Sequence, residues 1–345
     1  MQEWWSPKSL SGVKMRRSSE VRETLACASR GTQVVTDELH LLEDRLGRVH
    51  ARQRLGAEKD REAQGFGQRL NFFDLENPAV SLAIKYSLKM TGLYGRGRRN
   101  AEHVEVRHNT VQTRALPEGF DRFSILQISD LHCDISQPAM QRVTSLLPTM
   151  TYDICVLTGD LRGAMFGPFD AALAGIADLC ANIRSPVYGV LGDHDSIRMV
   201  PSLEKMGIRM LVNESERIER AGQSVYIAGI DDAHFYRVDN IEKATAAIPP
   251  DAFSVLLSHT PEIYRQAAHA GFSLLLSGHT HGGQICLPGG IPITLNAAVP
   301  RQLGTGPWKH QAMDGYTSAG AGSSVVPVRF NCPPEITLHH LETPR

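Results

Sequence analysis

The chain has 345 residues, with 36 Lys and Arg against 37 Asp and Glu and a formal net charge of -1. This length accommodates one large domain with extra material, or two domains, and an apolar fraction of 42% suffices for a sizeable core. Because a general nucleic-acid binder usually carries a strong basic excess, we expect no nucleic-acid partner. Fourteen histidines are many for this length, and several of them stand beside Asp and Gly.

The cysteines and the N-terminus bear on the cellular compartment. Six cysteines are widely spaced and none forms a C-x-x-C pair, which argues against a zinc ribbon and suits reduced thiols in a cytosolic protein. The first residues lack the pattern of a signal peptide, and no stretch approaches the roughly 18 uninterrupted apolar residues of a membrane span. We therefore expect a cytoplasmic protein.

The N-terminal third reads as polar and helical. We expect residues 1–35, which are rich in Ser, Arg and Thr, to be disordered. A charge-rich, helix-favouring segment follows at 37–64. Its apolar residues recur at steps of three and four: Leu39, Leu42, Leu46 and Val49. Such a stripe predicts an amphipathic helix that packs on the main domain or pairs with a partner helix.

A second helical segment at 78–94 leads into Arg96, Arg98 and Arg99. An apolar stretch followed by arginines can lie on an anionic membrane surface, which would place the protein at the inner face of the membrane. The alternative is a docking helix with a solvated basic end, and periodicity does not separate the two. In either case residues 36–103 form a predicted helical N-terminal extension.

From residue 104 onward, short β-rich runs alternate with helical patterns. Strands are predicted at 123–129, 154–158, 187–191, 224–230, 254–258 and 274–277, and helices at 168–183 and 261–270. This alternation predicts an α/β fold. Most of these strands end in a polar cluster, and ligands of open α/β sheets bind outside the carboxyl ends of strands.

Five of the predicted strand ends carry carboxylate or imidazole groups. In chain order they read Ser129-Asp130-Leu131-His132, Gly159-Asp160, Gly192-Asp193-His194-Asp195, Ser258-His259-Thr260-Pro261 and Gly278-His279-Thr280-His281-Gly282-Gly283. Residues i and i+2 of an extended segment project to the same side, so Asp130 and His132 can face one ion together. Imidazole with carboxylate suits Mn, Fe, Co, Ni or Zn rather than Ca or Mg alone. A buried neutral histidine explains any one fragment, but not easily five in order.

This ordered series resembles the signature of the calcineurin-like metallophosphoesterase family, which reads D-x-H, G-D, G-N-H followed by Asp or Glu, H, and G-H-x-H. The resemblance covers about residues 123 to 341. Runs 276–284 and 327–335 are similar to the bacterial YkuE/YaeI-like branch of that family. The resemblance implies a catalytic domain at 104–345 built from two packed mixed β-sheets flanked by helices, after the N-terminal helical extension.

The resemblance also implies a role for each matching residue. Asp130, His132 and His281 would hold a first metal ion, Asp160 would bridge two ions, and Asp193, His259 and His279 would hold the second. His194 would lie near the phosphate and donate a proton, with Asp195 orienting it. Two divalent or trivalent transition-metal ions would share a hydroxide that attacks phosphorus in line, so no protein nucleophile is required.

Two positions depart from the family pattern. Asp193 stands where Asn is usual, so it keeps a ligand oxygen, loses the amide donor and adds a charge that repels phosphate. Arg162 stands where many relatives have an acidic residue. It could bind a substrate phosphate through two hydrogen bonds, or pair with a nearby carboxylate.

The leading prediction is a two-metal phosphoesterase. Its substrate could be a phosphodiester, a phosphomonoester or the pyrophosphate of a nucleotide-linked lipid, and a membrane surface at 78–99 would favour the lipid. The alternative is a scaffold or binding module whose fold has lost its metals. Such a chain should lack several ligands, whereas only position 193 deviates here, and to another residue that can bind metal.

Overall fold

The computed structural model describes residues 39–67 and 78–344, and the chain divides into two compact units, 1–51 and 52–345. The expected disorder of residues 1–35 falls outside the described ranges. Residues 39–46 are helical, and Gly47, with a φ of +87°, ends that helix before α2 (Arg48–Gly67) begins. The single helix predicted over 37–64 is therefore wrong. Leu42 and Leu46 are buried, but Val49 beyond the break is 79% exposed.

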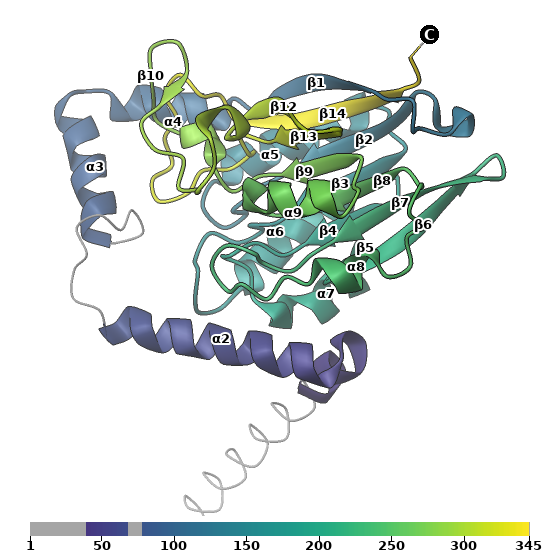
Figure 1. The fold of residues 1–345 in the computed structure, drawn as a ribbon. Coiled ribbons are helices and arrows are strands. Elements are labelled where there is room, and N and C mark those ends of the chain that lie inside the picture. The colour runs from purple at the N-terminus through teal and green to yellow at the C-terminus, as the bar shows by residue number, and fades with distance from the viewer. Residues whose placement is uncertain (1–38, 68–77, 345) are drawn as a thin grey trace, which may run out of the picture. The chain divides into compact units, whose positions relative to one another are not determined.

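Two six-stranded mixed sheets form the body of the second unit (Figure 1). The first sheet has the order β1 (Glu105–Gln112), β14 (Glu335–Glu342), β2 (Phe123–Ile128), β3 (Ile154–Thr158), β4 (Val187–Val190) and β5 (Ile208–Met210). The second has the order β12 (Gly306–His310), β13 (Met313–Thr317), β9 (Leu274–Ser277), β8 (Ser254–Leu257), β7 (Gln223–Gly229) and β6 (Glu214–Arg220). A short hairpin pairs β10 (Cys286–Leu287) with β11 (Ile291–Pro292).

The two sheets pack face to face around one apolar core. Ile125 and Val156 of the first sheet and Val255 and Leu276 of the second lie in the same buried cluster. Leu126, the neighbour of Ile125, is also fully buried although it projects from the opposite face. Strands that are buried on both faces need helices on their outer side.

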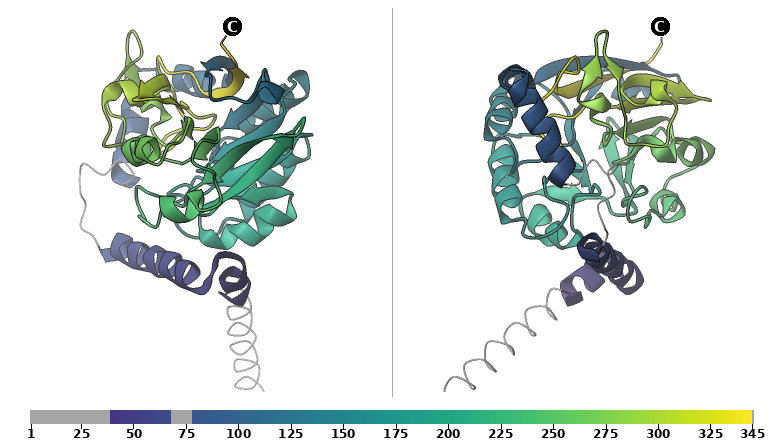
Figure 2. Two further views of the ribbon diagram at one scale, coloured as in Figure 1. Left: turned by 45° about the vertical axis from the view of Figure 1, so that its right-hand side comes forward. Right: turned by 90° about the vertical axis from the view of Figure 1, so that its left-hand side faces the viewer.

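Helices cover those outer faces (Figure 2). On the first sheet they are α5 (Gln137–Leu146), α6 (Asp170–Cys180) and α7 (Val200–Lys205), and on the second α8 (Ile241–Thr245) and α9 (Tyr264–His269). Tyr264 and Ala267 of α9 pack with Leu256 and Leu275 in a second apolar cluster. This arrangement confirms the predicted α/β fold of two packed mixed sheets flanked by helices.

Two more helices precede β1. The segment predicted as one helix over 78–94 is divided into α3 (Pro78–Met90) and α4 (Tyr94–Glu102), and Gly92, with a φ of +71°, lies between them. Within residues 39–67 and 78–344, no helix combines the length and the apolar character that a membrane crossing requires. The domain boundary expected between residues 103 and 104 stays a prediction.

Parallel strands bring the five motif loops together. Strands β2, β3 and β4 run parallel in the first sheet, and β8 and β9 run parallel in the second. Each of the five loops follows the carboxyl end of one of these strands. Because parallel strands end at the same edge of a sheet, the loops of both sheets meet at one edge of the sandwich.

Candidate metal centre

Seven buried side chains converge at this edge in two groups. The first group contains Asp130, His132, Asp160 and His281, and the second contains Asp193, His259 and His279. Within each group the candidate ligand atoms lie within 4.8 Å of one another. No member is more than 6% exposed. These are the seven residues that the sequence motifs predicted as metal ligands, and their role as ligands stays a prediction.

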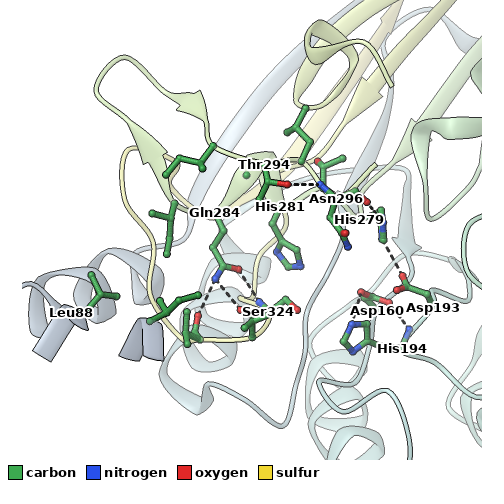
Figure 3. A pocket seen from close by; sticks show the side chains of 18 of the residues that line it. Leu88, Asp160, Asp193, His194, His279, His281, Gln284, Thr294, Asn296 and Ser324 are labelled. Carbon is green, nitrogen blue, oxygen red and sulfur yellow. Dashed lines mark hydrogen bonds and ion pairs between the residues drawn. The ribbon is translucent and has the colours of Figure 1, made fainter. Parts of the chain in front are cut away.

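Asp160 lies between the two groups. Its Oδ1 is 3.3 Å from Nε2 of His259, in the second group, and its Oδ2 is 3.7 Å from Nε2 of His132, in the first. Figure 3 shows Asp160 beside Asp193 and His194, all three of which line a pocket. One carboxylate thus offers an oxygen to each group, which is the placement that a bridging ligand requires.

The backbone at the motif loops is unusual. Five of the seven residues have a positive φ: Asp130 at 51°, His132 at 43°, Asp160 at 53°, His279 at 71° and His281 at 49°. Residues other than glycine rarely adopt this left-handed conformation, and such strain persists only where the surrounding structure imposes it. The strain directs side chains of closely spaced residues into one small volume.

Two glycines permit the close approach of the loops. A Cβ atom on Gly192 would lie 2.1 Å from Oδ1 of Asp160, and one on Gly278 would lie 1.9 Å from Oγ of Ser129. Both distances are far below van der Waals contact. The glycines before Asp193 and His279 are therefore needed because any side chain there would displace a candidate ligand or its neighbour.

Hydrogen bonds to backbone carbonyls orient three of the histidines. The pairs are His132 Nδ1 with Arg162 O at 2.9 Å, His259 Nδ1 with Thr158 O at 2.8 Å and His279 Nε2 with Asn296 O at 3.0 Å. A carbonyl oxygen only accepts, so each ring donates there and turns its other nitrogen toward the centre. Metal-binding histidines are typically fixed in this way.

Arg329 stands behind the fourth histidine. It is fully buried, and its Nη2 donates to the carbonyls of Ala319 and Gly322 at 2.7 and 2.6 Å and lies 3.2 Å from Nδ1 of His281. The two carbonyl oxygens take both N–H groups of Nη2, and Nη1 donates to the carbonyl oxygen of His281 at 3.3 Å, so Arg329 fixes the backbone around His281. Nε2 of His281 is 3.1 Å from Nε2 of His132, so the two nitrogens are close enough to bind one cation together.

The charges of the site compensate one another in the absence of metal. Burial raises the pKa of Asp130 to about 6 and lowers the pKa of His132 to about 4. Burial also opposes charging of His279, but the carboxylate of Asp193 outweighs it and raises the pKa of His279 to about 9. Compact, buried carboxylates and imidazoles that hold protons in this way form a donor set suited to divalent transition-metal ions.

His194 faces the cleft next to the first group. Its Nδ1 lies 2.7 Å from the carbonyl oxygen of Gly163, and its Nε2 lies 3.9 Å from Oδ2 of Asp160. The bond to Gly163 orients the ring, so that Nε2 faces Asp160 at the centre. This placement is consistent with the predicted role of His194.

Asp195 was expected to orient His194, and its carboxylate accepts hydrogen bonds from three backbone amides of the neighbouring loops. Oδ1 of Asp195 accepts from the amides of Leu161 and Arg162 at 2.9 and 3.2 Å, and Oδ2 accepts from the amide of Gly192 at 2.9 Å. The carboxylate therefore ties the loop after β3 to the loop after β4. These contacts support a structural role, and the orientation of His194 by Asp195 stays a prediction.

Arg162 was predicted to bind substrate phosphate or to pair with a carboxylate. The side chain is 3% exposed, and its nitrogens donate to the carbonyls of His194, Gly167 and Met165. These contacts close the loop after β3 and support the backbone of His194. They favour neither the phosphate contact nor the carboxylate pair expected from the sequence, because the guanidinium donates its hydrogen bonds to backbone carbonyl oxygens.

Two buried arginines were not singled out from the sequence. Arg329 stands in the apolar run Pro327-Val328-Arg329-Phe330, and a charge in such a run is a signal that could have been used. Arg54, which is fully buried, sits in a charge-rich helix where nothing distinguishes it from its solvated neighbours. Only the fold shows which arginine of that helix points inward.

A cavity of about 520 Å³ opens beside the metal centre (Figure 3). One wall is formed by residues of the centre: Asp160, Asp193, His194, His279 and His281. The remaining wall includes apolar side chains of α3, of the segment around the β10–β11 hairpin and of the loop before β14: Ile84, Leu88, Ile285, Ile293, Leu295 and Val326. The cavity thus joins a charged end to an apolar one.

Comparison with known proteins gives a consistent result. The calcineurin-like phosphoesterase family matches residues 123–283. The uncharacterized metallophosphoesterase YkoQ of Bacillus subtilis is 29% identical over 273 residues, covering 76% of this chain and 98% of YkoQ. YkuE of the same organism is 28% identical over 271 residues, covering 74% and 92%. Phosphodiesterase YaeI of Escherichia coli is 26% identical over 243 residues, covering 64% and 82%.

The two packed sheets and the converging carboxylates and imidazoles define a metal-dependent phosphoric ester hydrolase. Residues 123–283 of the chain are similar to the calcineurin-like phosphoesterases, and the chain is similar to YkoQ along 76% of its length. Its similarity to YkuE and YaeI confirms the resemblance to that branch of the family.

Proposed function

We propose that the protein hydrolyses a phosphate ester at a centre of two metal ions held by the seven converging residues. The observation that carries this proposal is the position of Asp160, whose two oxygens face different ligand groups. Two bound cations would activate water for attack on phosphorus and neutralise the phosphoryl oxygens. The donor set suits Mn, Fe, Zn, Co or Ni in the divalent or trivalent state.

The protein's own groups would position and protonate the substrate. Nε2 of His194 faces the cleft and is placed to donate a hydrogen bond, or a proton, to the oxygen that leaves phosphorus. The seven ligands are almost fully buried, so bulk water has little access to them. Low local polarity strengthens every charge interaction with the phosphate.

A metal analysis combined with an activity assay tests this function. Purified full-length protein is stripped with a chelator, reloaded with Mn²⁺ and assayed on a chromogenic phosphodiester. We expect two bound ions per chain, and activity that disappears on stripping and returns on reloading. A protein that binds fewer than one ion and hydrolyses nothing after reloading would instead be a scaffold or binding module.

The cavity supports a substrate that carries an apolar group. We propose that the ester is a phosphodiester, phosphomonoester or pyrophosphate with an acyl or alkyl portion, as in a lipid-linked substrate. The phosphate would lie at the metal centre, and the apolar portion would contact Ile84 and Leu88 of α3 and Ile293 opposite. Mostly apolar pockets with a few polar groups at one end are typical of such ligand sites.

A series of alkyl phosphodiesters of increasing chain length tests the substrate. Each buried methylene contributes about 0.8 kcal/mol, so KM should fall by up to about fourfold per added methylene until the cavity is full. Leu88→Asn should weaken this dependence. Leu82→Asn serves as the control, because Leu82 lies on α3 but is 50% exposed and does not line the cavity. A KM that is independent of chain length would exclude the apolar subsite.

A peripheral contact with an anionic membrane surface is the second part of the proposal. Leu82, Tyr86 and Met90, spaced four residues apart on α3, are 50%, 59% and 89% exposed. Lys85 and Lys89 lie on the same helix, and α4 adds the arginines noted from the sequence. Exposed apolar side chains flanked by basic ones are typical of helices that lie in a membrane interface. Lipid bound there would be next to the cavity that α3 lines.

Vesicle co-sedimentation tests this contact. The protein should bind vesicles that contain anionic phospholipid, bind less as salt increases, and bind zwitterionic vesicles weakly. Tyr86→Asp should reduce binding without changing hydrolysis of a short, water-soluble diester. Absence of binding to anionic vesicles at low salt would leave α3 as a helix that only packs on the catalytic unit.

A further inference from the structure

Helix α2 contacts the loop that follows β4. In the sequence, α2 ends well before residue 123, where the match to the family begins, and α3, α4 and β1 lie between them. Its Arg54 is fully buried, and Nη2 of Arg54 donates to the carbonyl oxygen of Asp195 at 2.8 Å. This loop carries Asp193 of the second ligand group and His194. A residue far upstream in the sequence therefore holds the backbone one residue beyond His194.

Glu58, one helical turn after Arg54, fixes the next part of the same loop. Its Oε2 accepts from Oγ of Ser196 at 2.7 Å, and its Oε1 accepts from the backbone amide of Ile197 at 2.8 Å. Oε1 also lies 3.1 Å from Nε of Arg54. The two side chains therefore act together on three consecutive residues of the loop.

The charge of Arg54 is balanced inside the protein. Its Nη1 lies 3.8 Å from Oδ1 of Asp231, and its guanidinium carbon lies 3.5 Å from the centre of the Tyr236 ring. Burial disfavours the cation, but the carboxylates of Asp231 and Glu58 outweigh this effect and raise the pKa of Arg54. An uncompensated buried charge is strongly destabilising, so this pairing keeps the cation in place.

The loop is short enough to transmit a displacement to the ligand. Strand β4 fixes one end at Val190, and the side chain of Asp195 bonds back to the amides of Gly192 and Leu161. Asp193 lies two residues before the backbone atom that Arg54 holds. If the far end of the loop moved, Oδ1 of Asp193 would move relative to His279, from which it is now 3.0 Å.

We infer that Arg54 and Glu58 are positioning residues, which hold the loop after β4 so that Asp193 completes the second ligand group and His194 faces the cleft. The inference rests on the proposed two-metal centre. Helix α2, which lies outside the residues that match the family, would then help to position the residues of the active site. Small errors in ligand placement have large effects at metal sites, because the groups that orient ligands control affinity and activity.

Two substitutions and two controls on the same helix test the inference in the full-length protein. Arg54→Met removes the guanidinium at similar size, and Glu58→Gln removes one charge without changing shape. Lys59→Met and Asp60→Asn are the matched controls, because both positions are exposed. Three quantities are measured: the affinity of each Mn²⁺ equivalent, the hydrogen exchange rate of amides 193–197, and kcat and KM separately. His279→Ala identifies which equivalent belongs to the second group.

We expect Arg54→Met and Glu58→Gln to lower the affinity for the second Mn²⁺ equivalent by about tenfold or more, because the loss of a hydrogen bond to a charged group has an effect of this size. The first equivalent should be unchanged, amide 197 should exchange faster, and kcat should fall more than KM rises. The controls should behave like the wild type.

Two results would overturn the inference. In the first, the folded variants bind both Mn²⁺ equivalents with wild-type affinity. In the second, they bind both equivalents more weakly by the same factor, which is the result expected of a merely structural role. If Arg54→Met does not fold, Glu58→Gln alone decides. If the wild-type protein takes up no metal, the proposed function fails. The exchange rates would then still show whether α2 holds the loop.

Discussion

Nδ1 of His279 lies 3.0 Å from Oδ1 of Asp193, and Oδ1 of Asp193 lies 2.9 Å from Nε2 of His259. One carboxylate oxygen thus faces two imidazoles whose outer nitrogens donate to backbone carbonyls. In the absence of metal the arrangement is stable only if protons occupy the space between these atoms. The second ligand group therefore binds protons at the positions where it would bind an ion.

Metal uptake should consequently release protons, and to different extents at the two groups. Because the pKa of His279 is raised to about 9, its proton competes with the second ion up to that pH. In the first group the pKa of His132 is lowered to about 4 and that of Asp130 is raised to about 6, so competition ends near pH 6. Between pH 6 and 9, affinity at the second group should rise by up to about tenfold per pH unit for each proton released.

Calorimetric titration with Mn²⁺ in two buffers of different ionisation enthalpy measures the protons released by each equivalent. The first equivalent should show little pH dependence above pH 6. An affinity of the second equivalent that is constant from pH 6 to 8 would contradict the assignment of a protonated His279.

Most of the candidate site could be predicted because the motifs are short and local. Asp130 and His132 follow one strand, and His279 and His281 follow another, so strand prediction alone places them at loop positions. Strands β3 and β9 have the predicted bounds because their buried runs end abruptly at glycine. The ligand set therefore depended on local signals, each of which the sequence contains.

What could not be predicted depends on contacts between distant segments. Strand β1 is polar along much of its length, and its partner β14 is more than 220 residues away, so neither stands out by periodicity. Asp195 bonds to the amide of Leu161, and Arg162 bonds to the carbonyl oxygen of His194, across two loops that only the fold brings together. Sequence motifs show which side chains are present but not which amide or carbonyl each one meets.

Asp160→Asn should reduce turnover by more than about 100-fold. Loss of a residue that only orients a metal ligand already costs up to about 100-fold, and Asp160 is itself a candidate ligand. The substitution removes the negative charge that faces both ligand groups, so both ions should bind less tightly. An asparagine oxygen can still accept from the amide of His194, which now lies 3.1 Å from Oδ1, so the fold should be retained. Circular dichroism checks the fold, and Asp178→Asn on the exposed side of α6 is the control. Turnover close to that of the control would rule out a bridging role.

His194→Ala should slow alkyl esters far more than activated aryl esters. A good leaving group departs without a proton, so only poor leaving groups need a donor at Nε2 of His194. The measurement is kcat/KM for a set of diesters whose leaving groups span a wide pKa range, and His108→Ala on the exposed face of β1 is the control. Equal losses across the set would indicate that His194 only binds the phosphate.

Asp193→Asn should change metal and substrate affinity in opposite directions. A neutral amide is a weaker ligand than a carboxylate, so the ion of the second group should bind less tightly. The same amide can donate a hydrogen bond to the phosphate and no longer repels it, so KM at saturating metal should fall by about tenfold, as expected for one hydrogen bond to a charged group.

The substitution should also change the pH dependence of metal binding. Asp193 is the main cause that raises the pKa of His279 against the effect of burial. With an amide in its place the pKa of His279 falls, fewer protons compete with the ion near neutral pH, and the slope of affinity against pH becomes smaller. Metal and substrate have to be titrated separately, because at limiting metal the two effects on rate oppose each other. If metal affinity, KM and the pH slope all stay as in the wild type, Asp193 is not a ligand, and the loop after β4 has been matched incorrectly to the family motif.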